Sequence, residues 1–333
     1  MGCQSVRYYG QAIRGQADIL RKRTSIEKLI ADQGVPEKLK ARLRLVLEIR
    51  RFAEKELQLP AGGHYLTYVG IDRPYVAWNV FAAPEFSLEP RTWRYPFVGC
   101  AAYRGYFAEK DALEYAEELK GEGLDVHVGG VEAYSTLGWF DDPVFSSFIM
   151  RSEASLAGLV FHELAHQAAF APGDTTFNES FAVAVEQEGV RRWFESAGKK
   201  DAYAAYLKRR DCSDRFTQLV EKYRVQLETL YGKDIGDAEK REEKARTFAA
   251  LKEEYGTWKR EGKGCAGYDS WFEQPANNAL IISVSVYNDL VPAFERLLLK
   301  NGGDLRKFYG ECKALAGKPE EERQERLRKL LTP

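Results

Sequence analysis

Residues 159–167 read Leu-Val-Phe-His-Glu-Leu-Ala-His-Gln, and the interpretation of the whole chain starts from this stretch. The apolar residues around it predict a buried helix, on which His162 and His166, four residues apart, share one face. Two unpaired imidazoles inside an apolar helix would be costly, so the pair indicates either hydrogen-bonded structural histidines or a metal site. Two histidines at this spacing can bind one Zn²⁺, with Glu163 as general base toward a metal-bound water.

A catalytic zinc site needs a third protein ligand. A histidine at the spacing of the three-histidine zinc proteins is absent, because position 172 is Pro172. This proline breaks the helix, so a second helix, expected over about residues 178–195, can fold back on the first. Its first turn carries Glu179, the favoured ligand, and Glu186 is the alternative, seven residues further along the same face. Thr176 and Glu179 also fit a capping box, in which Glu179 would only satisfy the start of the helix.

The two motifs together, HExxH at 162–166 and Asn-Glu-Ser-Phe-Ala at 178–182, resemble those of the gluzincin metallopeptidases. In their aminopeptidase branch the downstream glutamate ligates zinc, so the resemblance implies one zinc ion held by His162, His166 and Glu179. The chain departs from these motifs in two ways: Ser180 stands in place of the usual glycine, and the gap between the motifs is shorter. The shorter gap leaves the choice between Glu179 and Glu186 open.

The whole chain is also similar to a bacterial family of predicted zinc-dependent aminopeptidases, many of them lipoproteins. The segments that carry this wider resemblance, besides the two motifs, are residues 2–4, 137–143 and 287–294. It implies a peptide substrate and a gluzincin-like fold.

The resemblance also implies roles for other residues. Tyr287 is expected to donate a hydrogen bond to the tetrahedral oxyanion, with His127 as an alternative donor. The sequence Gly-Gly-Val-Glu that ends at Glu132 is similar to an aminopeptidase element whose extended edge binds peptide and whose glutamate binds the α-amine. Glu132 is therefore the expected amine anchor, and Asp141 and Asp142 are the competing carboxylates.

The remaining chain predicts an α+β protein with a modest, mostly antiparallel sheet in the N-terminal half and a helical C-terminal half. Strands are expected at residues 65–69, 75–81, 96–103 and 126–136, and helices at 15–59, 111–120 and from 143 to the end. Asp72-Arg73-Pro74 predicts a hairpin between the first two strands. We expect an N-terminal helical segment (1–60), a sheet-containing part (61–150) and a helical zinc-binding part (151–333) of one catalytic unit.

Composition excludes some classes of protein. Lys plus Arg number 49 and Asp plus Glu number 50, so the chain lacks the basic balance of a nucleic-acid-binding protein. Cys3 directly follows Gly2, as at the start of a mature bacterial lipoprotein, which predicts a lipid anchor and a periplasm-facing location in the cell envelope of a Gram-negative bacterium. The four other cysteines, Cys100, Cys212, Cys265 and Cys312, could then form two disulfides or remain unpaired thiols.

These observations favour a zinc-dependent peptidase, expected to act as an aminopeptidase on short peptides. Two other functions stay open: an envelope endopeptidase in protein quality control, and a non-catalytic, zinc-stabilised binding lipoprotein. Glu163 speaks against the last of these, because a purely structural zinc site needs no general base.

Overall fold

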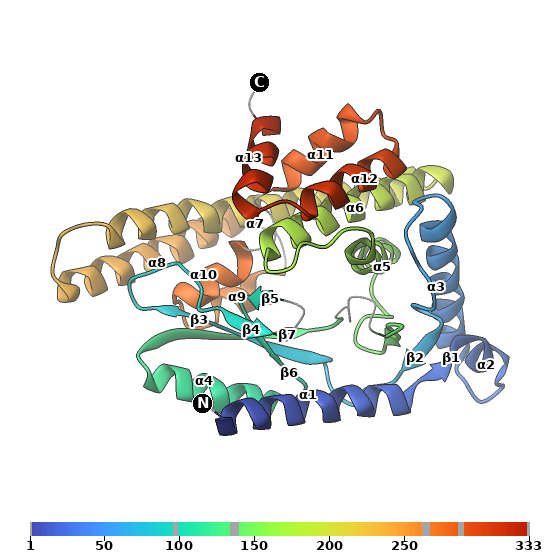
Figure 1. The fold of residues 1–333 in the computed structure, drawn as a ribbon, viewed down its shortest axis with the longest axis horizontal. Coiled ribbons are helices and arrows are strands. Elements are labelled where there is room, and N and C mark those ends of the chain that lie inside the picture. Colours follow the sequence, from blue (N-terminus) through green and yellow to red (C-terminus); the bar gives the residue numbers. More distant parts are fainter. Residues whose placement is uncertain (1, 96–98, 134–139, 262–266, 286–289, 332–333) are drawn as a thin grey trace.

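The structure, a computed structural model, describes residues 2–95, 99–133, 140–261, 267–285 and 290–331 (Figure 1). Its helices are α1 (Gly2–Lys22), α2 (Ile26–Ala31), α3 (Glu37–Lys55), α4 (Glu109–Gly121), α5 (Glu153–Ala168), α6 (Thr175–Ser196), α7 (Lys200–Tyr231), α8 (Asp237–Arg260), α9 (Asp269–Phe272), α10 (Asn278–Ser285), α11 (Val291–Lys300), α12 (Leu305–Ala316) and α13 (Glu320–Leu331). Its strands are β1 (Thr24–Ser25), β2 (Thr67–Val69), β3 (Ala77–Pro84), β4 (Trp93–Tyr95), β5 (Gly99–Ala101), β6 (Arg104–Tyr106), β7 (Leu124–Val131) and β8 (Val144–Phe145).

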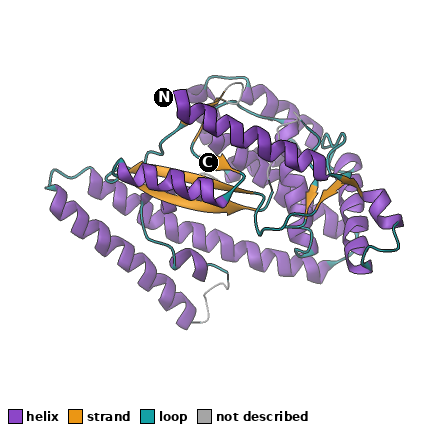
Figure 2. Cartoon of the chain, turned by 90° about the horizontal axis from the view of Figure 1, so that it is seen from below, coloured by secondary structure: helices purple, strands orange, loops and turns teal. Residues whose placement is uncertain are grey.

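The strands form three small sheets, the largest with the order β6-β3-β7. β3 and β7 pair antiparallel over eight residues, in a register that sets Phe81 opposite His127. One face of this sheet, with Trp78 and Val80, packs on Tyr115 and Leu119 of α4, which runs along the sheet in Figure 2. All strand pairs are antiparallel except β2–β8. The predicted α+β class and the helical C-terminal half are confirmed.

The predicted hairpin between residues 65–69 and 75–81 is wrong. β2 pairs with β1 and β8, whereas β3 pairs with β6 and β7 in a different sheet. The Arg73 guanidinium donates hydrogen bonds to the carbonyls of Tyr75 and Val76, so the loop between β2 and β3 is held by contacts within itself. β3 finds in β7 a partner for all eight of its residues, which the short β2 could not supply. The expectation of helix from residue 143 onward also needs correction, because β8 comes first.

Most of the helices share one hydrophobic core. It runs from Ile19 and Ile26 near the N-terminus through α3, α5 and α6 to Leu327 in α13. At its centre the Phe181 ring lies 5.7 Å from that of Phe294 and 5.8 Å from that of Phe308, so α6 joins α11 and α12. The long α7–α8 pair extends from this body with a core of its own, in which Tyr255 stacks on Phe272 at 4.0 Å.

The cysteines follow neither predicted alternative. Cys212 is disulfide-bonded, whereas Cys100 and Cys312 are free thiols. Two disulfides among the four cysteines are therefore excluded. Cys312 lies in the main core, where it packs as a small apolar side chain.

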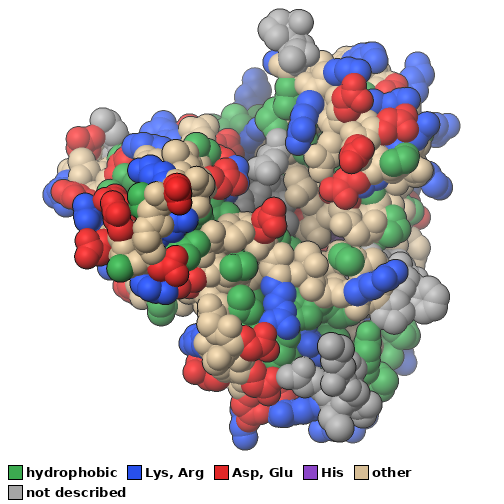
Figure 3. All heavy atoms as spheres, turned by 60° about the vertical axis from the view of Figure 1, so that its left-hand side comes forward, with side chains coloured by type: hydrophobic (Ala, Val, Ile, Leu, Met, Phe, Trp, Pro, Cys, Tyr) green, Lys and Arg blue, Asp and Glu red, His purple; other side chains and the backbone are tan. Residues whose placement is uncertain are grey.

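On the face in Figure 3 acidic and basic side chains are interspersed, as expected from their near-equal numbers. Among the described residues, no helix combines the length and the apolar character needed to span a bilayer.

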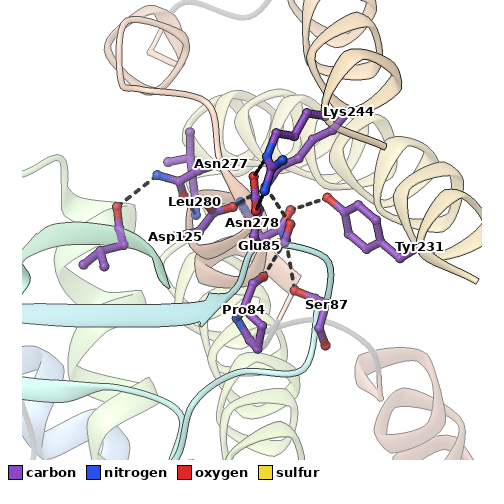
Figure 4. Close-up of polar contacts among 11 residues, drawn as sticks. Pro84, Glu85, Ser87, Asp125, Tyr231, Lys244, Asn277, Asn278 and Leu280 are labelled. Carbon is purple, nitrogen blue, oxygen red and sulfur yellow. Dashed lines mark hydrogen bonds and ion pairs between the residues drawn. The ribbon is translucent and has the colours of Figure 1, made fainter. Parts of the chain in front are cut away.

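The buried side chain of Asn278 joins the α7–α8 pair to the sheet (Figure 4). Its Nδ2 donates to the carbonyls of Pro84, Glu85 and Ser87, each at 3.0 Å, and its Oδ1 accepts from the Tyr231 hydroxyl at 2.7 Å. The Asn278 backbone N–H donates to Asp125, whose carboxylate also pairs with Lys244 at 2.6 Å. The Asn278 side-chain amide thus supplies hydrogen-bond partners to polar groups of β3, of the loop after β3 and of α7, and is itself shielded from water.

We predict that Asn278→Ala lowers the free energy of unfolding by about 3 kcal/mol, because it leaves buried polar groups without partners. Chemical denaturation monitored by circular dichroism measures this loss. The control is Asn301→Ala, since the Asn301 side chain bonds only to a carbonyl of its own helix at 2.9 Å. Equal unfolding energies for the two variants would contradict the structural role of Asn278.

Candidate metal centre

α5 is the helix that the HExxH motif predicts. Ser152 caps it by accepting a hydrogen bond from the Ser155 N–H at 3.2 Å. Leu156, Val160 and Leu164 bury one side of α5 in the main core. The helix ends where Ala169 turns extended, and this end precedes Pro172, as predicted.

α6 folds back on α5 through a turn that is held by the side chains of Asn178, in α6, and of Asp174, its N-cap. The Asn178 amide makes two hydrogen bonds to the backbone of Ala171, one from the Ala171 N–H at 2.7 Å and one to its carbonyl at 2.9 Å. Asp174 caps α6 by accepting from the Phe177 N–H at 2.8 Å. The capping-box alternative for Glu179 is therefore wrong, because α6 begins at Thr175 with Asp174 as its cap.

His162, His166 and Glu179 converge. Their potential metal-ligand atoms all lie within 4.8 Å of one another. Among the described residues, these three form the one group of His, Cys, Asp or Glu side chains that could hold a metal ion. Glu179 Oε2 lies 3.2 Å from His162 Nε2 and 3.9 Å from His166 Nε2. The sequence therefore predicted which three side chains come together.

Glu186, the alternative ligand, contacts the opposite side of His162. Its Oε2 lies 3.3 Å from His162 Nδ1, so the ring is held between two carboxylates. Gly158, one turn before His162, makes this possible, because a Cβ there would lie 2.8 Å from the Glu186 carboxylate. Sequence reasoning missed this role of Gly158, although a glycine inside an apolar helix is itself a signal of close approach.

The electrostatics of the two histidines differ. Burial lowers the pKa of His162, but hydrogen bonds with Glu179 and Glu186 outweigh burial and hold that pKa well above its ordinary value. Burial lowers the pKa of His166 to about 4, so this ring is neutral. Its Nδ1 is buried without a hydrogen-bond partner among the described residues. Burial raises the pKa of Glu179, but His162 and His166 bring it below the ordinary value.

Glu163, the residue after His162 in α5, is half-buried. Burial, more than its charged neighbours, raises the pKa of its carboxyl to about 7. The Glu163 carboxylate adds to the effect of burial in raising the pKa of Tyr65 and of Tyr103. Sequence reasoning missed both tyrosines, since residue 65 was expected in a strand.

Of the other predicted site residues, Glu132 and His127 do not belong to the group of three converging side chains. Tyr287 is outside the described residues. The Glu132 carboxylate pairs with Arg151 at 2.5 Å, directly after β7 ends. His127 lies on β7 and stacks on Phe81, and burial lowers its pKa to about 4.

The competing carboxylates differ in burial. Asp142 is buried, and its backbone N–H donates to His64 Nδ1 at 3.0 Å. Asp141 is exposed, and its carboxylate covers Gly63.

Comparison with known proteins identifies the family. A search of curated proteins and a search of solved structures each found no match. A family model described as "Putative aminopeptidase" matches residues 7–327, which include the whole histidine and glutamate cluster. The chain belongs to this aminopeptidase family.

Proposed function

We propose that the protein is a zinc-dependent aminopeptidase that hydrolyses short peptides. The observation that carries the proposal is the convergence of His162, His166 and Glu179 within 4.8 Å, with the half-buried Glu163 directly after His162 in α5. Membership of an aminopeptidase family supports a peptidase.

The donor set fits zinc. Donor atoms bound tetrahedrally at about 2.0–2.1 Å lie roughly 3.4 Å apart. The separations of 3.2 and 3.9 Å from Glu179 to the two imidazoles agree with this. His166 is kept neutral by burial, so its Nε2 lone pair is available to a metal. A histidine that binds a metal is commonly oriented by a carboxylate on its other ring nitrogen. Glu186 lies beside that second nitrogen of His162 and fits this role.

Each residue of the site then has a role in the reaction. Bound to the three side chains, zinc would polarise the scissile carbonyl and activate a water. Glu163, with its raised pKa, takes a proton from the attacking water and returns it to the leaving amine. Glu132 is proposed to bind the substrate α-amine in competition with Arg151, and Tyr287 to donate to the oxyanion.

Zinc content should distinguish the ligand from its supporting carboxylate. We predict that Glu179→Ala removes zinc, whereas Glu186→Gln retains it with an affinity about 10–100-fold weaker. Elemental analysis and titration against a chelator measure both effects. Glu195→Gln, an exposed position on α6, is the control. If zinc is lost from the Glu186 variant and kept in the Glu179 variant, the two roles are reversed.

Substitution of the general base should separate chemistry from metal binding. Glu163→Gln is expected to lower kcat by about 10²–10⁴-fold with zinc content unchanged. The assay compares aminoacyl anilides and short peptides with and without N-acetylation. Activity on free but not acetylated substrates indicates an aminopeptidase, and cleavage inside acetylated peptides an endopeptidase. Wild-type protein without bound metal would refute the scheme.

The pH profile should reflect Glu163. A general base works in its ionised form, so kcat/KM rises with pH through the pKa of its carboxyl. That pKa is about 7 without metal, and a bound cation lowers it by favouring the charged form. The acidic limb of the profile is therefore expected at or below pH 7. A limb that persists unchanged in the residual activity of Glu163→Gln would assign it to another group.

A further inference from the structure

A cavity of about 540 Å³ lies between α8 on one side and the segment from α9 to α10 on the other. Its volume is typical of small-molecule binding sites. Four apolar side chains line it, namely Phe248 and Leu251 of α8, Phe272 of α9 and Leu280 of α10. Each of these residues is at most 9% exposed, so together they form an apolar floor rather than a solvated rim.

The charged side chains at one end of the cavity are paired with one another (Figure 4). Lys244 Nζ lies 2.6 Å from the Asp125 carboxylate, which also accepts from the Asn278 N–H. The Arg241 guanidinium bonds to both oxygens of the Glu85 carboxylate, at 2.7 and 2.8 Å. Both cations already have a partner, so this end of the cavity offers no unpaired charge to a ligand.

Lys252 lines the other end of the cavity and has no such partner. It follows Lys244 by eight residues in α8, which is a rise of about 12 Å along the helix. Tyr255, one turn later, stacks on Phe272 at 4.0 Å, so this part of α8 lies against α9. Among the described residues, Lys252 makes no hydrogen bond or ion pair. The three cations and two carboxylates that line the cavity therefore leave one positive charge unpaired.

The α9 wall of the cavity also contains a hydrogen-bond donor without an acceptor. Trp271 lines the cavity, and its Nε1–H is buried and has no hydrogen-bond partner among the described residues. Buried N–H groups normally have an acceptor. An unpaired ammonium and an unmatched indole N–H, at one end of an apolar cavity, favour a ligand that carries one negative charge and accepts hydrogen bonds. A carboxylate has both properties.

We propose that this cavity binds a small molecule with an apolar body and one carboxylate. The hydrocarbon part covers Phe248, Leu251 and Leu280, and the carboxylate pairs with the Lys252 ammonium. A monoanion fits better than a phosphate, because one cation of the cavity is free and the other two are held by Glu85 and Asp125. The inference goes beyond the proposed peptidase function and does not depend on it, since no residue of the candidate metal centre lines the cavity.

Three probes with the same hydrocarbon body test the charge of the ligand. They are 6-phenylhexanoate, 6-phenylhexanamide and 6-phenylhexylamine, each titrated calorimetrically into the full-length protein. We expect the carboxylate to bind about fivefold more tightly than the amide, which is the effect of a partly exposed ion pair. The amine should bind more weakly than the amide, because its charge is repelled by Lys252.

Substitutions locate the site. Lys252→Gln should remove the preference, so that the carboxylate and the amide bind with affinities equal within about twofold. Lys313→Gln is the matched control, since Lys313 is an exposed lysine of α12 outside the cavity, and it should keep the preference. Ala249→Trp fills the cavity from an exposed position of α8 and should abolish binding of all three probes. Ala245→Phe fills the same cavity, and the unfolding midpoint of each variant shows that it is folded.

Several results would overturn the proposal. No binding of the carboxylate to the wild-type protein would remove the site. Equal affinities for the three probes, or a preference that survives Lys252→Gln, would remove the assigned charge. Binding that persists in both cavity-filling variants would place the probe elsewhere, for example at the candidate metal centre. None of these results bears on zinc content or peptide hydrolysis, which test the proposed function separately.

Discussion

The turn between α5 and α6 is the constraint on which the candidate metal centre depends. Ligands from two helices meet only if the helices run antiparallel in one register. The Asn178 amide, bonded to both backbone groups of Ala171, and the Asp174 cap fix where α6 begins. Glu179 is the residue after Asn178, so the side chain that closes the turn also sets the ligand position opposite His162.

The charges of the side chains at this centre are coupled to one another. Glu163, Glu179 and Glu186 lie around two imidazoles in a partly buried region, where unpaired charges are costly. The pKa of His162 is raised, so in the absence of another cation its imidazole is protonated and places a positive charge between the carboxylates of Glu179 and Glu186. Because a metal ion must displace that proton, its binding and the pH of the solution are linked.

Much of this architecture follows from local sequence. The helix around His162, the break at Pro172 and the convergence with Glu179 are consequences of helical periodicity, which acts over a few residues. The partners of β2 and β3 were mispredicted because strand pairing depends on distant segments, here β1, β8 and β7. The left-handed backbone conformation of Tyr65 was not predicted for a similar reason. Its positive φ is imposed by Asp142 and Arg50, and an aromatic residue before β-branched ones otherwise favours a strand.

The buried ion pair between Arg323 of α13 and Asp174 has a consequence for biosynthesis. Both residues are 4% exposed, and Arg323 lies 2.7 Å from the second carboxylate oxygen of Asp174, the residue that caps α6. Until α13 has been synthesised, the Arg323 guanidinium that pairs with Asp174 is missing, and burial of the Asp174 carboxylate is unfavourable. The turn that positions Glu179 is therefore completed by a residue 149 positions further along the chain than Asp174. The candidate metal centre is therefore assembled only after α13 has been synthesised.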